Sequence, residues 1–153
     1  MYKYYKPSIN EIDKMQNLVL NDVENGNILV RSESEMATNI RSYRVVFDGD
    51  ILIGFVALHI HSINLAEIRS LVVRDEYRGK GIGKELIKHC INEAKDINLK
   101  EILVLTYKQN LFEKFDFKLI DKSSLPDTKI WADCVKCKYF PICDEIALTL
   151  KLL

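Results

Sequence analysis

The sequence predicts an α+β (α/β) fold, in which helices flank a β-sheet, within a single domain that spans residues 1–153. The chain has 153 residues, of which 48% are hydrophobic and 29% charged, a balance typical of one globular domain with a buried core. Strand-like and helix-like segments follow one another in the order β-α-α-β-β-β-α-β-α-β-loop-β. Asp48-Gly49-Asp50 separates two strand-like runs and predicts a hairpin, because glycine adopts the positive φ angles of such turns.

The N-terminal part contains two helix-start signals. Ser8 with Glu11 and Ser32 with Glu35 have the spacing of capping boxes, in which each side chain satisfies a backbone donor of the first helical turn. Before the hairpin turn we expect a strand at 2–6, helices at 7–23 and 32–40, and a strand at 43–48. The strand that follows the turn should span 51–61.

The remaining part contains a strongly amphipathic helix. After Gly81, apolar residues recur at helical spacing, and this stripe should face the core: Ile82, Leu86, Ile87, Cys90, Ile91 and Ala94. The other expected elements are strands at 65–73, 100–106, 117–121 and 145–150, with a short helix at 110–115. Residues 122–143 form one long irregular segment, and such loops in a compact domain are often functional.

Charge and hydropathy exclude two classes of partner. Lys and Arg number 22, as do Asp and Glu, so the formal net charge is zero, whereas nucleic-acid binders usually carry a basic excess. No apolar run approaches the ~20 residues needed to span a bilayer, and the N-terminus lacks the apolar stretch of a signal peptide. We therefore expect a cytoplasmic protein without nucleic-acid or membrane partners.

A turn dense in glycine and cations lies between an apolar strand and the amphipathic helix. A helix N-terminus offers unpaired N–H groups and partial positive charge, and glycines let the backbone approach a phosphate closely. The spacing is that of neither a P-loop nor a Rossmann fingerprint. The turn predicts a pyrophosphate site, built from three cations and three glycines: Arg78, Lys80, Lys84, Gly79, Gly81 and Gly83.

Arg78-x-x-Gly81-x-Gly83 after an apolar strand resembles the acyl-CoA signature of the GCN5-related N-acetyltransferase (GNAT) family, and the order of elements fits that fold. The resemblance implies a mixed, mostly antiparallel sheet that splays between its fourth and fifth strands, with acetyl-CoA as co-substrate. Many members pair, so it also raises a homodimer as an expectation. The residues it places against coenzyme A are Leu71, Val72, Val73, Arg78, Gly79, Lys80, Gly81, Ile82, Gly83 and Lys84.

A narrower resemblance covers residues 29–32, 66–73, 105–106, 112–117 and the tail from Lys129. These segments are similar to the acetyltransferase domain of N-acetylglutamate synthases, above all to the short stand-alone form. This implies acetylation of the α-amino group of L-glutamate, which opens arginine biosynthesis. Two alternatives stay open: another amine as acceptor (a protein N-terminus, a polyamine or a drug), and a non-catalytic acyl-CoA-binding module.

The sequence departs from the family at the expected general acid. Many members carry a Tyr directly before a Glu-Lys-x-Gly-Phe stretch, whereas this chain has Phe112 there and Asp116 at the Gly. Catalysis by a Tyr at that place is therefore excluded, and Tyr107 becomes the candidate substitute. The long synthases also end with an Arg-Ser pair near the last strand, which this chain lacks.

The reaction needs a base, because only a neutral amine attacks a thioester. Glu67 lies on the strand that would flank the acetyl group, and we predict that it acts through a water molecule. His59 and His61, on the neighbouring strand, are rival bases. A backbone N–H near Leu71 or Val72, at a bulge in the strand, should donate to the oxyanion.

Glutamate carries two carboxylates, which guanidinium groups bind in a two-pronged way. Arg31 and Arg69 are therefore the substrate candidates, with Arg31 preferred because it directly precedes a capped helix. Lys108 and Lys129 are weaker candidates. Lys129 and Trp131 belong to the long loop, which would cover the acceptor pocket.

That loop also carries Cys134-x-x-Cys137-x5-Cys143. Structural zinc usually takes four ligands, so Asp133 or Asp144 would have to complete the set. Zinc, free thiols and a redox-active disulfide all remain open, and in a reducing cytosol free thiols are the preferred interpretation. We therefore predict no metal site as the leading case, and Cys90 as a core residue.

Overall fold

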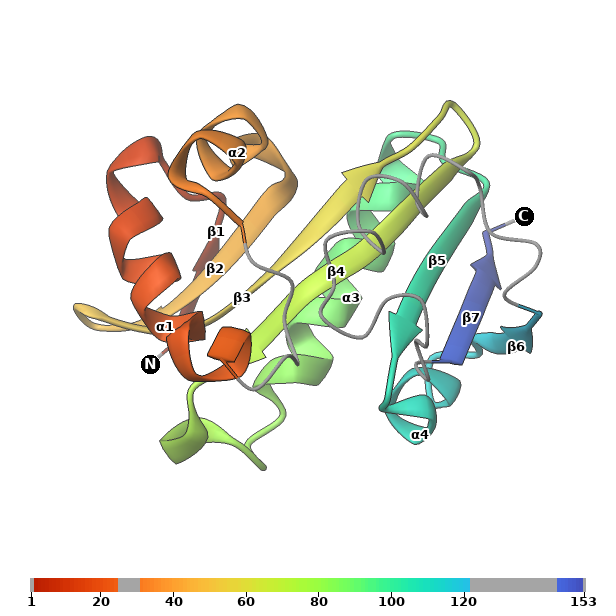
Figure 1. The fold of residues 1–153 in the computed structure, drawn as a ribbon. Coiled ribbons are helices and arrows are strands. Elements are labelled where there is room, and N and C mark those ends of the chain that lie inside the picture. Colours follow the sequence, from red (N-terminus) through yellow and green to blue (C-terminus); the bar gives the residue numbers. More distant parts are fainter. Residues whose placement is uncertain (1, 25–30, 122–145, 153) are drawn as a thin grey trace.

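The computed structural model describes residues 2–24, 31–121 and 146–152, which build one seven-stranded sheet (Figure 1). The strands lie side by side in the order β1-β2-β3-β4-β5-β7-β6. β4 and β5 are parallel and every other neighbouring pair is antiparallel, so the mixed, mostly antiparallel sheet is confirmed. The strands are β1 (Tyr2–Tyr5), β2 (Tyr43–Asp48), β3 (Ile51–Ile60), β4 (Leu65–Val73), β5 (Glu101–Thr106), β6 (Lys118–Ile120) and β7 (Ile146–Lys151).

The helices follow the predicted order with shifted ends. They are α1 (Ile12–Glu24), α2 (Glu33–Thr38), α3 (Ile82–Asp96) and α4 (Gln109–Glu113), with 3-10 turns at Ile9–Glu11, Ile40–Ser42 and Asp75–Tyr77. The first turn before α1 is a 3-10 turn, in which the Glu11 carboxylate accepts the Ser8 N–H at 2.8 Å. α2 ends at Thr38 rather than Ile40, because Asn39 leaves the helical conformation and its side-chain amide donates to the Glu35 carbonyl at 2.9 Å.

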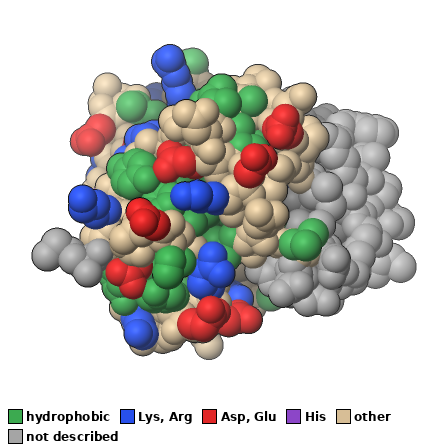
Figure 2. Space-filling view, turned by 90° about the vertical axis from the view of Figure 1, so that its left-hand side faces the viewer, with side chains coloured by type: hydrophobic (Ala, Val, Ile, Leu, Met, Phe, Trp, Pro, Cys, Tyr) green, Lys and Arg blue, Asp and Glu red, His purple; other side chains and the backbone are tan. Residues whose placement is uncertain are grey.

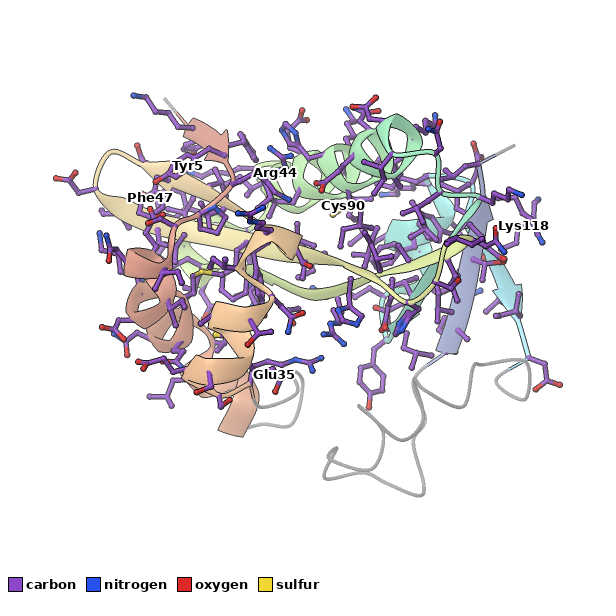
Figure 3. The ribbon with its side chains drawn as sticks, turned by 90° about the horizontal axis from the view of Figure 1, so that it is seen from above. Tyr5, Glu35, Arg44, Phe47, Cys90 and Lys118 are labelled. Carbon is purple, nitrogen blue, oxygen red and sulfur yellow. The ribbon has the colours of Figure 1, made fainter. Side chains whose placement is uncertain are left out.

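Two apolar layers enclose the sheet, one on each face (Figure 3). α1 and α2 cover the face that carries Val45, while α3 covers the face that carries Val46, as the alternation along β2 requires. Cys90 of α3 and Glu35 of α2 accordingly lie on opposite sides of the sheet in Figure 3. Burial raises the pKa of the Cys90 thiol to about 12, which confirms this residue as a core residue.

The surface on the side of α1 carries charges of both signs (Figure 2). Acidic and basic side chains alternate there with hydrophobic ones, and neither sign forms a continuous patch on this face. None of the helices in the described ranges combines the length and the apolar character that a bilayer crossing requires.

Candidate active site

The glycine-rich turn lies between the end of β4 and the start of α3. Gly79 and Gly81 have φ angles of 79° and 82°, and a Cβ at either position would meet no atom within 4 Å. The backbone conformation, rather than crowding, therefore selects glycine here. The Glu85 N–H donates to the Gly81 carbonyl at 3.0 Å, as the first bond of α3. The N–H groups of residues 82–84 precede that bond and therefore have no partner within the helix.

Contacts with β2 and β3 fix the position of this turn. The Arg74 N–H donates to the Ile53 carbonyl at 2.7 Å, and the Arg74 guanidinium donates to the Leu52 carbonyl at 3.1 and 2.9 Å. The Tyr77 hydroxyl donates to Asp48 Oδ2 at 2.8 Å. A turn held at its first residues in this way presents its glycines in a defined place.

The cations predicted around the turn are on its surface. Arg78 pairs with Asp75 at 3.1 Å with half of its side chain exposed, and Lys80 lies over the Tyr77 ring at 5.5 Å. Lys84 is also exposed. Ile82 differs from them, because its side chain is buried in the core, so it can offer a ligand only its backbone.

β4 carries the bulge that the oxyanion prediction needs. Ala57 pairs with Arg69 and Phe55 pairs with Val72, so two steps along β3 correspond to three along β4. Ser70 has a φ of 59°, which is rare for a residue other than glycine and marks the extra residue. Val72 points into the core beneath α1 and α2, which leaves its backbone as its contribution to any site.

Gly54 lets β3 approach this bulge closely. A Cβ at Gly54 would lie 2.8 Å from the Val72 carbonyl oxygen and 3.3 Å from Val46 Cγ1. We expect Gly54→Ala to cost about 1–3 kcal/mol of stability, which would lower the melting temperature by about 3–10 °C in differential scanning fluorimetry. Gly83→Ala is the matched control, since its Cβ would make an ordinary contact of 3.8 Å. Equal melting temperatures for the two variants would contradict the close approach.

The sheet opens between β4 and β5. These strands pair over three positions, Leu65 with Glu101, Ala66 with Ile102 and Glu67 with Leu103, and then β4 runs on to Val73 apart from β5. Figure 1 shows the two arrows diverging. The gap lies where the family resemblance places the splay, and Leu71 and Val73 lie on its β4 side.

Glu67 lies at the closed end of this gap and is buried, with 1% of its surface exposed. Glu67 is therefore not an exposed strand carboxylate. Its Oε1 lies 2.8 Å from Nε2 of His61, and His59 pairs with Glu67 across the β3–β4 ladder. His59 Nδ1 lies 3.0 Å from Nη2 of Arg69, and the two imidazole rings meet edge to face at 4.9 Å. The three candidate bases thus form one cluster.

Arg31 and Arg69 approach Tyr43 from different elements. Arg31, with 8% of its side chain exposed, pairs with Glu35 of α2 at 2.8 Å, so it is not a solvated surface residue. Tyr43 pairs with Ala57, which pairs with Arg69. Burial raises the pKa of Tyr43, the positive charges of Arg31 and Arg69 oppose that rise, and the charge of Glu35 adds to it. Both arginines therefore act on one buried hydroxyl.

The remaining candidates lie elsewhere. Tyr107 and Lys108 follow the end of β5, on the far side of the gap; Tyr107 is 48% exposed, and the Lys108 N–H donates to Thr106 Oγ1 at 2.9 Å. Phe112 is buried against Phe117. The predicted roles of Lys129, Trp131, Cys134, Cys137 and Cys143 concern positions outside the described residues.

Two members of the site were not predicted. Tyr43 and Glu35 were read only as a strand residue and a capping residue. The hairpin at Asp48-Gly49-Asp50 sets the register of β2 and β3, which places Tyr43 opposite Ala57. That register was the signal in the sequence that could have placed Tyr43 near the site. Glu35 lies one helical turn after Arg31, a spacing that favours an ion pair.

Comparison with known proteins places the chain among acetyltransferases. The profile of the acetyltransferase (GNAT) family matches residues 14–117. An uncharacterized N-acetyltransferase of Chlorobaculum tepidum is 37% identical over 123 residues, which cover 80% of this chain and 79% of that protein. An amino-acid acetyltransferase of Buchnera aphidicola is 28% identical over 124 residues, which cover 80% of this chain but 28% of that protein.

Solved structures share the fold over the whole chain. The N-acetylglutamate synthase of Neisseria gonorrhoeae, complexed with coenzyme A and N-acetyl-glutamate, superposes with a TM-score of 0.86 at 20% identity over 100% of this chain and 35% of its own. Rv2747 of Mycobacterium tuberculosis, in complex with CoA, gives 0.83 at 20% identity over 99% of both chains. Since the family profile matches more than half of the sequence, and the Chlorobaculum relative aligns with most of it, the chain belongs to the GNAT family of acetyltransferases.

Proposed function

We propose that this chain transfers the acetyl group of acetyl-CoA to the α-amino group of an amino acid, with L-glutamate as the first-choice acceptor, in the cytoplasm and at the entry to arginine biosynthesis. One observation carries the proposal: β4 parts from β5 beyond Glu67, a buried carboxylate, and leads to the glycine-rich N-terminus of α3. This arrangement would accommodate a long phosphate-bearing donor along β4, with a base at its far end.

The residues around the gap fit coenzyme A. Its pyrophosphate would accept from the N–H groups of residues 82–84, at the positive end of α3, with Lys80 and Lys84 nearby. Its pantetheine arm would lie against the backbone of Leu71 and Val73, in the part of β4 that no longer pairs with β5. The Neisseria synthase and Rv2747, which share this fold, are complexes with CoA.

The chemistry that the site would support is direct transfer. Acetyl-CoA supplies an activated thioester carbonyl. Glu67 takes a proton from the acceptor ammonium through water, the amine forms the new C–N bond, and the C–S bond breaks. A backbone N–H at the Ser70 bulge donates to the developing oxyanion. Tyr107 gives a proton to the departing thiolate, and the second proton of the amine nitrogen, lost as the amide forms, returns to Tyr107 through water.

The arginines would recognise the acceptor. Arg31 and Arg69 supply guanidinium groups beside Tyr43, close to the strand that carries Glu67. Two cations suit an acceptor with two carboxylates. The Buchnera relative named as an amino-acid acetyltransferase, and the Neisseria synthase complexed with N-acetyl-glutamate, support an amino acid as the acceptor. Lys108, Lys129 and Trp131 remain proposed acceptor contacts.

An assay of thiol release over a panel of amines tests the function. The panel contains L-glutamate, other amino acids, a polyamine and a peptide with a free N-terminus, and we expect the highest kcat/KM with L-glutamate. Faster turnover of the polyamine or the peptide would show that the acceptor is that amine rather than L-glutamate. Tight binding of CoA in calorimetry without turnover of any amine would show that the protein is a non-catalytic binding module rather than an enzyme.

Arg31→Ala tests the acceptor site separately. We expect the KM for L-glutamate to rise about tenfold, because a charge-assisted hydrogen bond is lost, while the KM for acetyl-CoA stays within twofold. Arg41→Ala is the matched control, since Arg41 is exposed in the turn after α2 and should change neither constant. Equal rises of both KM values in Arg31→Ala would remove Arg31 from the acceptor site.

A further inference from the structure

One histidine, His59, lies near the end of β3 and another, His61, directly follows the strand, and each contacts a different residue of β4. His61 lies against Glu67 at 2.8 Å, and His59 lies against Arg69 at 3.0 Å. In the proposed function, Glu67 removes a proton from the acceptor and Arg69 binds a carboxylate of the acceptor, whereas the histidines have no role. The contacts show that the histidines are neither exposed nor independent of these two residues.

The His61–Glu67 contact is buried. The side chain of Glu67 is 2% exposed and that of His61 is 8% exposed. Burying an ionised carboxylate is costly unless a donor or a cation faces it. His61 can supply that donor, because its ring nitrogen points at Oε1 and an ionised carboxylate only accepts. A carboxylate held by this donor stays ionised, which is the state that can take a proton from the acceptor.

The backbone holds His61 in place. Its N–H donates to the Leu65 carbonyl at 2.9 Å, and in the adjacent turn Ser62 Oγ accepts the N–H groups of Asn64 and Leu65 at 3.2 Å each. The imidazole is therefore carried by an ordered turn that closes the β3–β4 hairpin. A donor on such a support limits the rotamers of the Glu67 side chain.

The His59–Arg69 contact has the opposite polarity. A guanidinium only donates, so Nδ1 of His59 accepts and the ring proton lies on Nε2. A second proton on Nδ1 would break this contact and place two cations together. His59 thus orients Arg69 while it remains neutral. The edge-to-face contact of the two rings, at 4.9 Å and 77°, fixes one histidine against the other.

We propose that these two histidines are positioning residues with separate tasks. His61 donates from Nε2 to Glu67, keeps this carboxylate ionised and orients it toward the acceptor amine. His59 accepts from Arg69 and aims its guanidinium at the acceptor carboxylate. The proposal rests on the proposed function, and it deepens that function by dividing one cluster into a proton-transfer half and a recognition half.

The two tasks predict different kinetic defects. His61→Leu should lower kcat about ten- to a hundredfold with little change in the acceptor KM, because Glu67 loses a hydrogen bond to its charge. His59→Leu should raise the acceptor KM by a similar factor with little change in kcat. His61→Gln restores a donor and His59→Asn restores an acceptor, so each should recover most of its own defect. Defects of one kind in both Leu variants would overturn the division.

The pH profile separates positioning from loss of structure. Within residues 2–24, 31–121 and 146–152, the titratable and charged groups recorded beside the pair include His59 and Arg69, with Arg31, Glu35 and Tyr43 beyond Arg69. A carboxylate that loses a donor protonates at higher pH. The acid limb of kcat/KM should therefore move to higher pH in His61→Leu, less in His61→Gln, and not at all in the control His89→Leu. His89 stacks on Tyr4 away from this site. An unmoved acid limb in His61→Leu would overturn the role of His61.

A measurement on the unliganded protein makes the proposal independent of turnover. Long-range ¹H–¹⁵N correlation spectra at mildly alkaline pH report the tautomer of each of the three histidines. We expect the proton on Nε2 in both His59 and His61. A proton on Nδ1 of either ring would overturn the contact of that histidine, whether or not any amine is acetylated. If the tautomers are as expected but the protein acetylates no amine, the two histidine contacts are supported and the proposed function is wrong. The positioning roles of the histidines, which depend on that function, would then be wrong as well.

Discussion

Replacing Glu67 with Gln is expected to lower kcat about 100- to 10,000-fold, the range over which general bases contribute. The substitution preserves shape, and the amide oxygen can still accept from His61 at the 2.8 Å contact. Only the capacity to take a proton is lost. Steady-state kinetics measure kcat, and calorimetry with CoA should give an unchanged dissociation constant, because Glu67 lies at the end of the gap away from the glycine turn.

Glu101→Gln is the matched control for this variant. Glu101 is also a strand glutamate beside the β4–β5 junction, but it pairs with Leu65 in the ladder and lies 3.9 Å from Lys151. We expect its kcat to stay within twofold of the unmodified protein. If Glu67→Gln kept a kcat within threefold, another group would have to be the base.

The second large effect is expected from Gly83→Glu, for which stability and binding should change in opposite directions. Gly83 is in the first turn of α3 at a negative φ, and an added Cβ would make a 3.8 Å contact with Val73 Cγ2. An acidic residue near a helix N-terminus is favourable, so the melting temperature should stay equal or rise. The same carboxylate would meet the pyrophosphate, so the affinity for CoA should fall about 100-fold or more.

Gly83→Ala separates charge from bulk in this test. It gives the same helix a side chain without charge, so it should keep the melting temperature and most of the affinity for CoA. Fluorimetry and calorimetry on the two variants measure both quantities. If Gly83→Glu bound CoA as tightly as Gly83→Ala, the pyrophosphate could not lie at this helix terminus.

Local signals in the sequence were enough to predict most of the fold. The hairpin turn, the cap at Ser32 and the apolar stripe of α3 each lie within a few consecutive residues, and the structure confirms all three. The end of α2 differed because Asn39 competes for a helix carbonyl with its own side chain. A bulge is expected near Leu71 or Val72, but its exact position at Ser70 depends on how β3 and β4 align around Gly54.

The same reasoning explains which part of the site was predictable. The glycines and cations of the turn are contiguous, so their chemistry was visible in the sequence. Glu67 and His61 were both named, but as competitors, because their 2.8 Å contact depends on the register of a hairpin. Tyr43 joins Arg31 and Arg69 only when α2 packs beside β2, which no short motif encodes.

The brief ladder between β4 and β5 has a consequence for how this protein can diverge. Three residue pairs join the two strands, and beyond them β4 and β5 no longer pair with each other. In the proposed function, the amide-bearing pantetheine arm of coenzyme A would occupy this place. Recognition of this kind reads a peptide-like chain through main-chain atoms. Mutational drift at Leu71 or Val73 should thus be silent while the residues stay apolar. An insertion that let β4 and β5 continue to pair beyond Glu67 should abolish acetyltransferase activity while the sheet remains folded.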